Sequence, residues 1–380
     1  MKKKFLATVV SIASLSAGSL FAVGPDTGGS GTQDYSYMLD SGNSISVSRT
    51  SSSPKVTGTS TDGTYTNPYK TLTTTSIQAK WDYNGTMIGI SQSSPYGVDL
   101  NYTTGFMTNL GAKITSSETA ILASRGLASG FKIFGGIRLN QFKATVDKPY
   151  YGGAGNPTLS KAGGYQYSLD TGTSTGFTIG AAYEVPQIYL RASIQYNTEI
   201  EHKNVKVTES LAGATTSTSG IEDYLAPSST IIKLRSALSP KLLAFLNYRS
   251  TQYDGLKVTG PVHTQLGGGN IYDPSSGTDL TFGAAFVISD QLTALVGAAR
   301  GQAKSDGGNE SALSPYGDSS SQFIGGSFKV NDNFELNASY SLTSLGDANA
   351  DVVVSPGVAG VGSFTDNKAT RVSIGTKISF

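Results

Sequence analysis

The sequence predicts an all-β protein, a transmembrane antiparallel β-barrel of about fourteen strands with a short plug-like segment at its amino end. Three observations lead to this prediction. The last residues, 370–380, alternate apolar and polar side chains and end on the aromatic Phe380. Residues 1–22 have the pattern of an export signal. The composition is low both in hydrophobic residues, at 38%, and in charged residues, at 14%.

The carboxy-terminal segment is predicted to be a strand with lipid on one side and water on the other. Apolar residues recur at period two on one face and polar residues fill the other face: Val372, Ile374, Ile378 and Phe380 against Arg371, Ser373, Lys377 and Ser379. A strand of a soluble sandwich could show the same alternation. It would not need a terminal Phe380 together with an export signal, so we expect a barrel that the barrel-assembly machinery engages through Phe380.

The amino end divides into a signal peptide, residues 1–22, and a short hatch-like segment, residues 23–43, which precedes the predicted barrel, residues 44–380. Lysines 2–4 form the charged region of the signal, residues 5–20 its mostly apolar stretch, and Ala22 a small residue suited to cleavage. Serines interrupt the apolar stretch, and no other segment contains a run of about 18 apolar residues. The mature chain is therefore expected to be exported and not anchored by a helix.

Composition limits the kind of protein further. Gly, Ser, Thr and Tyr take the place of the hydrophobic and charged residues of a soluble globule, which is typical of a barrel with a polar lumen. We therefore expect no buried globular core, and we expect tyrosines in the girdles at the membrane interfaces. The absence of cysteine excludes disulfides and thiolate chemistry, and a net charge of +1 argues against a nucleic-acid partner.

Alternating segments joined by turn residues give the expected strands. They are 44–49, 77–81, 86–101, 118–125, 131–144, 177–185, 188–200, 230–238, 242–253, 280–288, 292–302, 322–330, 334–343 and 370–380. Short turns join these strands in pairs, which places the turns in the periplasm. The long connections are expected to be exterior loops: 50–75, 102–117, 145–175, 202–229, 254–278, 303–321 and 344–369.

Four segments of the chain resemble the FadL family of outer-membrane channels for long-chain fatty acids and other hydrophobic compounds. They are GTMIGISQSSPYGVDLNY (85–102), GFTIGAAYEVPQIYLRASIQYNTEIEH (176–202), LSPKLLAFLNYRSTQYDGLKV (238–258) and FELNASY (334–340). The resemblance implies a monomer in the outer membrane, beneath lipopolysaccharide, that takes up hydrophobic or amphipathic small molecules passively. It also implies a hatch inside the barrel and lateral release through a kink in the third strand.

The third predicted strand contains residues suited to such a kink: Ser93, Pro95, Tyr96 and Gly97. Pro95 cannot donate a ladder hydrogen bond, and Gly97 weakens strand pairing. The alternative is that the strand simply ends and turns at Pro95.

The hatch is where the chain departs from the family. Residues 23–43 are glycine-rich, shorter than the usual hatch, and lack the Asn-Pro-Ala motif that family hatches carry. Only four side chains could plug the barrel by packing: Tyr35, Tyr37, Met38 and Leu39. A flexible leader into the first strand is the alternative interpretation.

Assigning apolar positions to lipid fixes the lumen by parity and makes the lumen net positive. We expect Arg138, Arg191 and Arg249 to favour a carboxylate head group, because guanidinium offers a bidentate partner. The apolar residues predicted to face the lumen could hold an acyl chain: Leu243, Phe245, Val287, Leu295 and Phe323. The alternatives are that the arginines pair with other charges of the lumen, and that the apolar residues pack the hatch or one another.

No pattern in the chain indicates an enzyme, a cofactor or a metal site. His202 and His263 fall in predicted exterior loops without a neighbouring ligand spacing. The sequence therefore predicts an outer-membrane channel for passive uptake of hydrophobic molecules such as long-chain fatty acids. A porin for small polar solutes is the first alternative, supported by the charged lumen and the missing hatch motif. A surface adhesin or structural barrel is the second, supported by the long polar loops.

Overall fold

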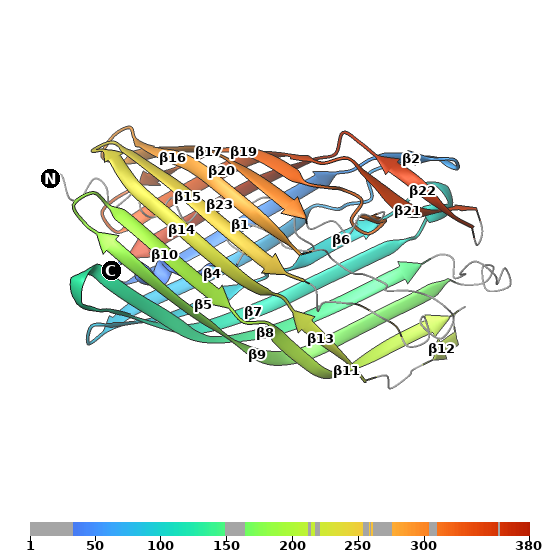
Figure 1. Ribbon diagram of the computed structural model, residues 1–380, viewed down its shortest axis with the longest axis horizontal. Helices are drawn as coiled ribbons and strands as arrows, with labels where there is room; N and C mark the ends of the chain where they lie inside the picture. Colours follow the sequence, from blue (N-terminus) through green and yellow to red (C-terminus); the bar gives the residue numbers. More distant parts are fainter. Residues whose placement is uncertain are drawn as a thin grey trace.

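The computed structural model of the chain is a closed antiparallel β-barrel (Figure 1). The structure describes residues 33–148, 164–211, 214–216, 221–253, 258, 260, 276–303, 310–355 and 358–380. The predicted signal peptide, the first part of the predicted hatch-like segment and His263 lie outside the described residues. The barrel closes because β1 (Ser44–Lys55) pairs with β23 (Lys368–Ser379) on one side and with β4 (Leu72–Tyr83) on the other.

Fourteen strands make the wall, which confirms the prediction. Three of them are interrupted and consist of two elements each: β5 (Thr86–Ser93) with β6 (Gly97–Asn101), β10 (Leu190–Asn197) with β11 (Ile200–Leu211), and β13 (Ile221–Ala226) with β14 (Ser228–Ser239). The remaining wall strands are β7 (Gly111–Gly126), β8 (Phe131–Lys148), β9 (Tyr165–Val185), β15 (Leu242–Gln252), β16 (Gly277–Val287), β17 (Leu292–Ala303), β19 (Ser319–Lys329) and β20 (Phe334–Leu345). A short β12 (Ala214–Thr216) pairs with the end of β11.

Short turns close the hairpins at one end of the barrel, at the left of Figure 1, where β23 and the chain also end. The tightest is Asn84-Gly85, which joins β4 to β5 directly after the pair Tyr83↔Thr86. Both turn residues have positive φ, 53° and 79°, as a two-residue hairpin that follows the strand twist requires. The sequence placed its turns correctly because Asn, Asp, Gly, Ser and Pro mark them.

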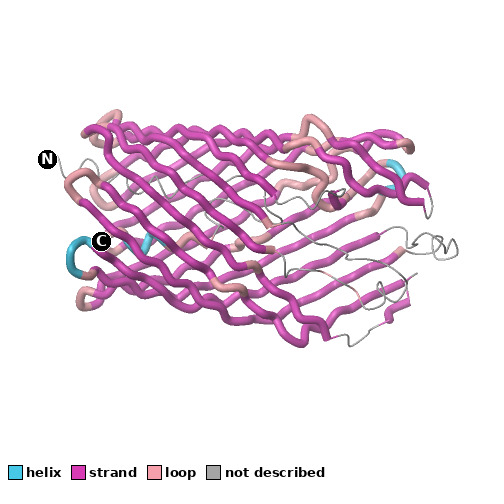
Figure 2. Tube along the Cα trace, in the orientation of Figure 1, coloured by secondary structure: helices cyan, strands magenta, loops and turns pink. Residues whose placement is uncertain are grey.

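The other end of the barrel carries a second, smaller sheet. It contains β2 (Gly58–Ser60), β3 (Gly63–Tyr65), β18 (Glu310–Ser311), β21 (Ala348–Ser355) and β22 (Val358–Phe364). These strands lie in segments that the sequence predicts as loops, and Figure 2 shows them as strands beyond the barrel wall. The sequence prediction of long connections did not include the strands that three of them contain.

The outer face of the wall changes character along each long strand. On β9, Phe177 and Ile179 point outward and are 58% and 66% exposed, whereas Tyr165 and Tyr167 of the same strand are buried inside. The change falls near the row of paired residues Ser93, Glu118, Asn140 and Ser174. We call the barrel from the short turns to this row the turn half, and the remainder the loop half.

The loop half has a buried core, contrary to the expectation from composition. Its cluster includes tyrosines from wall strands and from the second sheet, among them Tyr65, Tyr102, Tyr165, Tyr167, Tyr224 and Tyr253. Burying such rings stabilises a packed interior, since each removes a large apolar area from water. The same inversion explains why β9 begins at Tyr165 rather than at the predicted 177, and β7 at Gly111 rather than at 118.

Within the described residues, the helical elements are short 3₁₀ turns: η3 (Ser36–Leu39), η4 (Gly105–Met107) and η5 (Ala128–Gly130). Among the described residues, no helix has the length and apolar character needed to cross a membrane.

Candidate functional site

The wall is interrupted beside the third strand, at the residues that the sequence singles out. β5 ends at Ser93 and β6 begins at Gly97, so Pro95 and Tyr96 belong to neither strand. Pairing of β4 with this strand stops at Ile77↔Gln92 and resumes only at the isolated bridge Tyr69↔Leu100. All residues between these two pairs are described, and no ladder pair joins them.

The interruption keeps the register on the β4 side. Seven residues lie between the two flanking pairs on each strand, so Thr75 falls opposite Ser94 in the continued register. On the β7 side the register shifts, because three residues between Ser93 and Gly97 face two residues of β7. The third strand therefore bulges away from β4 while β7 continues unbroken. A strand that ends and turns away at Pro95, the alternative interpretation, is wrong because β6 continues in the same wall.

Tyr96 at the interruption is buried and connects the wall to the barrel interior. Its backbone N–H donates to Ser116 Oγ at 2.8 Å, and Ser116 Oγ donates to the Tyr96 carbonyl at 2.8 Å. Its hydroxyl donates to Gln33 Oε1 at 3.2 Å. The first described residue of the amino-terminal segment thus contacts the interruption directly.

Residues 33–40 of the amino-terminal segment lie inside the barrel against the wall. Tyr35, Tyr37, Met38 and Leu39 are all buried, and they pack on wall residues of β5, β7, β8 and β9. The four side chains that could plug the barrel are therefore packed inside it, although whether they gate it stays a prediction. Gly89 of β5 makes room for this packing, because a Cβ there would lie 2.2 Å from Met38 Sδ.

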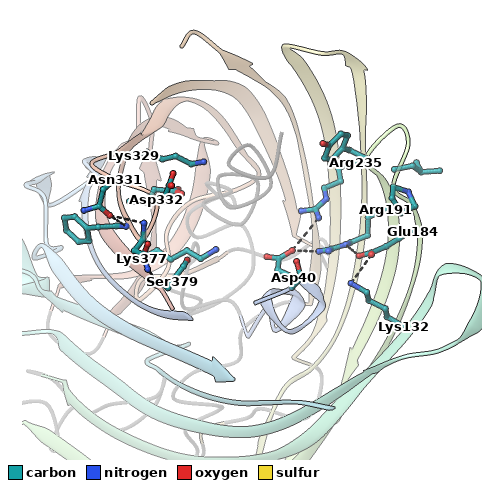
Figure 3. Close-up of a pocket in the computed structure, with 17 residues that line it drawn as sticks. Asp40, Lys132, Glu184, Arg191, Arg235, Lys329, Asn331, Asp332, Lys377 and Ser379 are labelled. Atoms are coloured by element: carbon teal, nitrogen blue, oxygen red, sulfur yellow. Dashed lines mark hydrogen bonds and ion pairs between the residues drawn. The ribbon is translucent and has the colours of Figure 1, made fainter. Parts of the chain in front are cut away.

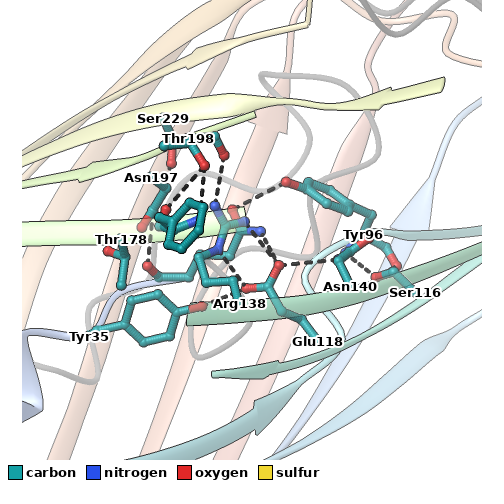
Figure 4. Close-up of polar contacts among 12 residues, drawn as sticks. Tyr35, Tyr96, Ser116, Glu118, Arg138, Asn140, Thr178, Asn197, Thr198 and Ser229 are labelled. Atoms are coloured by element: carbon teal, nitrogen blue, oxygen red, sulfur yellow. Dashed lines mark hydrogen bonds and ion pairs between the residues drawn. The ribbon is translucent and has the colours of Figure 1, made fainter. Parts of the chain in front are cut away.

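The buried pair of Glu118 and Arg138 stands at the border between the two halves (Figure 4). Arg138 donates from Nε and Nη2 to the two carboxylate oxygens of Glu118, at 3.2 and 2.9 Å. The side chain of Arg138 is 0% exposed and that of Glu118 is 1% exposed. Tyr35 and Gln33 also donate to this carboxylate, at 2.5 and 2.9 Å. The sequence predicted that Arg138 would bind a ligand carboxylate. In the structure the Glu118 carboxylate occupies that place, and the sequence interpretation did not identify Glu118.

Arg191 is also engaged by acids of the chain. Its Nε donates to Glu184 Oε1 at 2.5 Å and its Nη1 to Asp40 Oδ1 at 2.7 Å. Arg249 is buried in β15, where its register partner on β16 is Asp279. The three predicted arginines all point inward, as parity required, but they do not converge on one site. Parity could have identified Glu118 as their counterpart, since it lies on the inward face of a predicted strand.

The five apolar residues predicted to face the lumen form one cluster. Leu243, Phe245, Val287, Leu295 and Phe323 are buried together with Ala285 on β15, β16, β17 and β19. The rings of Phe245 and Phe323 lie 6.5 Å apart between centroids. The cluster confirms that these side chains pack on one another, which leaves an apolar stripe on the inner wall of the turn half.

A cavity of about 410 Å³ opens inside the turn end of the barrel (Figure 3). Five basic side chains line it against four acidic ones: Lys132, Arg191, Arg235, Lys329 and Lys377 against Asp40, Glu184, Asp332 and Glu335. Figure 3 shows Asp40 with Arg191, Arg235, Glu184 and Lys132 on one side, and Lys329 and Lys377 on the other. Burial alone would raise the pKa of the Asp40 carboxyl, but Arg191 and Arg235 hold this pKa well below its usual range.

The described residues contain no group of three or more His, Asp or Glu side chains that could hold a metal ion. His202 lies in β11 and is buried, so its expected place in an exposed loop is wrong. The inversion in the loop half explains the error. The prediction recognised strands by apolar residues on their outer face, and in the loop half the apolar residues lie on the inner face.

The fold and the closed, apolar-coated wall define an outer-membrane barrel, since spanning strands in lipid need every edge paired. Among solved structures, the chain is similar to a FadL homologue of Pseudomonas aeruginosa, with a TM-score of 0.74 and 13% identity over 96% of this chain and 99% of that chain.

Two channels described as toluene transporters share the same architecture. They are TodX of Pseudomonas putida, with a TM-score of 0.62 and 10% identity over 97% of each chain, and TbuX of Ralstonia pickettii, with a TM-score of 0.58 and 11% identity over 94% of this chain and 95% of that chain. No protein-family profile and no curated protein sequence matches the chain. The likeness therefore concerns the fold, which is that of FadL-like channels.

Proposed function

We propose that this chain is an outer-membrane channel for the passive uptake of hydrophobic molecules such as long-chain fatty acids. Release is lateral, through the interruption between β4 and the third strand. The observation that carries the proposal is this interruption, because Tyr96 links it to Gln33 of the amino-terminal segment. A second interruption lies between β9 and the strand formed by β10 and β11, where pairing stops at Thr178↔Asn197 and resumes at Leu169↔Val207. A break in strand-to-strand pairing is unfavourable in contact with lipid, so a barrel with a purely structural role gains nothing from losing the β4 ladder here.

The position of the interruption suits lateral release. It begins directly after the pair Ile77↔Gln92, and Ile77 points outward and is 41% exposed. The outer face changes there from apolar to polar, so a molecule leaving the barrel would meet the edge of the lipid layer. Inside the wall, the loop-half core supplies tyrosine rings and aliphatic side chains to a ligand arriving through the loops.

The amino-terminal segment is the proposed gate. Gln33 contacts Tyr96 at the interruption and Glu118 in the buried pair, so movement of the segment would change both. Tyr35, Tyr37, Met38 and Leu39 hold the segment against the wall by apolar packing. Phe380, at the end of β23, remains the proposed contact with the barrel-assembly machinery.

A porin for small polar solutes is the second candidate, and the charged turn-end cavity is the observation that favours it. It requires an open aqueous path, and the loop half is occupied by buried apolar side chains. Steady single-channel conductance of small ions through the purified protein would favour the porin over the hydrophobic channel.

The test is uptake of a labelled long-chain fatty acid by cells that lack their own channel, with this protein present or absent. Toluene is the second probe, because channels of the same fold are described as toluene transporters. A gain with either probe supports hydrophobic uptake. No gain, with insertion confirmed, would contradict it.

Lateral release has its own test, because the chain has no cysteine and engineered pairs are unambiguous. Thr75→Cys with Ser94→Cys, bridged by a short bis-maleimide that adds one thiol to each of its ends, should abolish uptake by closing the interruption. Thr50→Cys with Ser373→Cys is the control, since these side-chain oxygens lie 3.1 Å apart in an intact ladder. If both bridged pairs transport equally, the lateral route is wrong even though the channel is active.

A further inference from the structure

We infer that the turn-end cavity binds the anionic head group of an amphipathic carboxylate, and that it does so by displacing the side chain of Asp40. The inference rests on the proposed function and deepens it. It assigns the cavity to a ligand class and gives the release of the amino-terminal segment a chemical cause.

Asp40 occupies a cradle of cations that would suit a ligand carboxylate equally well. Its carboxylate lies 2.7 Å from Arg191 Nη1 and 3.5 Å from Arg235 Nη2. Lys80 donates to the backbone carbonyl oxygens of Tyr37, at 2.9 Å, and of Asp40. The carboxylate and the carbonyl oxygens together present the cradle with the negative charge that a head group would bring.

The cradle does not depend on Asp40 for its shape. Glu184 holds Arg191 at 2.5 Å and Lys132 at 2.9 Å, and it belongs to the wall rather than to the amino-terminal segment. When Asp40 leaves, Arg191 therefore keeps one carboxylate partner and its orientation. Binding to a cation that is already held in place costs less conformational entropy, so an incoming carboxylate can compete with Asp40.

Charge balance favours an anion in the vacated place. With Asp40 present, five basic side chains line the cavity against four acidic ones, and without it they face three. Lys329 and Lys377 lie across the cavity from the cradle and add to its positive potential (Figure 3). The volume of about 410 Å³ lies within the range typical of small-ligand sites.

The cradle adjoins the apolar stripe on the wall. Phe245 is the register partner of Arg235, and a small pocket beside the cavity is lined by Phe245 together with Asp40, Arg191 and Arg235. A carboxylate in the position of Asp40 would therefore place its first methylenes against Phe245. Each methylene removed from water contributes about 0.8 kcal/mol to binding. The site selects amphipathic carboxylates over neutral molecules of the same chain length.

The experiment follows a spin label on Ser41→Cys while purified protein in a non-ionic detergent is titrated with laurate or with dodecanol. Ser41 lines the cavity next to Asp40, and the chain has no other cysteine. Laurate should mobilise the label and dodecanol should not. In Asp40→Asn the label should be mobile without ligand, and laurate should bind about tenfold more tightly, because the internal competitor is gone.

Asp332→Asn is the matched control, because Asp332 lines the same cavity without contacting the amino-terminal segment in any described interaction. It removes one acid and should leave the label immobile. If Asp332→Asn acts like Asp40→Asn, general charge explains the effect and displacement is wrong. Arg235→Gln should weaken laurate binding and leave dodecanol binding unchanged. If laurate and dodecanol mobilise the label equally, the cavity is not a site for an anionic head group.

Failure of this inference is distinguishable from failure of the proposed function. Uptake of both a fatty acid and toluene without any difference between laurate and dodecanol would leave the channel intact and remove the head-group site. Loss of uptake for every hydrophobic probe would remove the channel itself.

Discussion

In the turn half of the barrel, Ile121 and Ile179 point outward while Lys80 and Arg138 are buried inside. In the loop half, Gln166 faces outward and Tyr165 and Tyr167 are buried inside. The same strands run through both halves, so the inversion reflects what surrounds the wall rather than the strand geometry. Lipid outside favours a polar interior, and water outside favours an apolar one.

The border between the halves is where the functional features meet. Ser93 at the wall interruption, Glu118 and Asn140 lie in one row of paired residues. Arg138, which binds Glu118 of this row, also donates from Nη1 to the Thr198 carbonyl at 2.9 Å, just after the end of β10. The buried pair of Glu118 and Arg138 thus connects two interrupted strands. We therefore expect substitutions in this pair to have the largest effect on stability.

The largest expected effect comes from breaking that pair. Arg138→Met leaves the Glu118 carboxylate buried without its cation and should destabilise the barrel by about 3–5 kcal/mol. Denaturant unfolding in detergent, compared with the unaltered protein, measures the change. The double variant Glu118→Met with Arg138→Met should recover most of the loss, because no buried charge remains. A double variant as unstable as the single one would show that the pair is not the cause.

The next effect tests the two environments on a single strand. Ile179→Arg puts a charge on the lipid-facing side of β9 and should cost about 2–4 kcal/mol. Gln166→Arg, outward on the same strand in the loop half and opposite Asp147, should cost nothing measurable. Equal costs would mean that the apolar outer face does not end near the border row. Folding yield into vesicles and denaturant unfolding provide the measurement.

The turn half could be predicted from sequence because one rule governs it. Apolar alternation found all fourteen wall strands and placed Arg191 and Phe245 inside, and the turn residues found the short hairpins. Pro95 and Gly97 marked the interruption through backbone chemistry alone. These features are local, so a single sequence contains them.

The loop half could not be predicted by the same rule, since its alternation has the opposite sense. Tyr165 and Tyr167 look like interfacial girdle residues until β9 is known to continue beyond the membrane. The partners of the arginines were missed for another reason. Asp40 is more than 150 residues from Arg191 in the chain, and local patterns give no information about such a contact.

A smaller effect tests how the amino-terminal segment is held. Gly89→Ala places a methyl group against Met38 Sδ, 2.2 Å away before relaxation, and should weaken docking of the segment by about 1–3 kcal/mol. Mobility of a spin label at Ser41→Cys measures the docking. Met38→Ala in the same background should restore it. Gly126→Ala is the control, because a Cβ there meets nothing within 4 Å.

The smallest effect concerns pH, and its sign follows from Asp40. Arg191, Arg235, Lys80 and Lys377 outweigh burial and hold the carboxyl pKa below its ordinary value of about 3.9, so the ion pairs stabilise the docked segment at every pH above that value. The stabilisation is lost only as pH falls from there through the lowered pKa. Label mobility at Ser41→Cys should therefore stay constant between about pH 5 and 8 and rise in stronger acid. In Asp40→Asn this acid-dependent rise in label mobility should vanish. If the label becomes mobile between pH 6 and 8 while Asp40 is still present, a different titrating group controls docking of the segment.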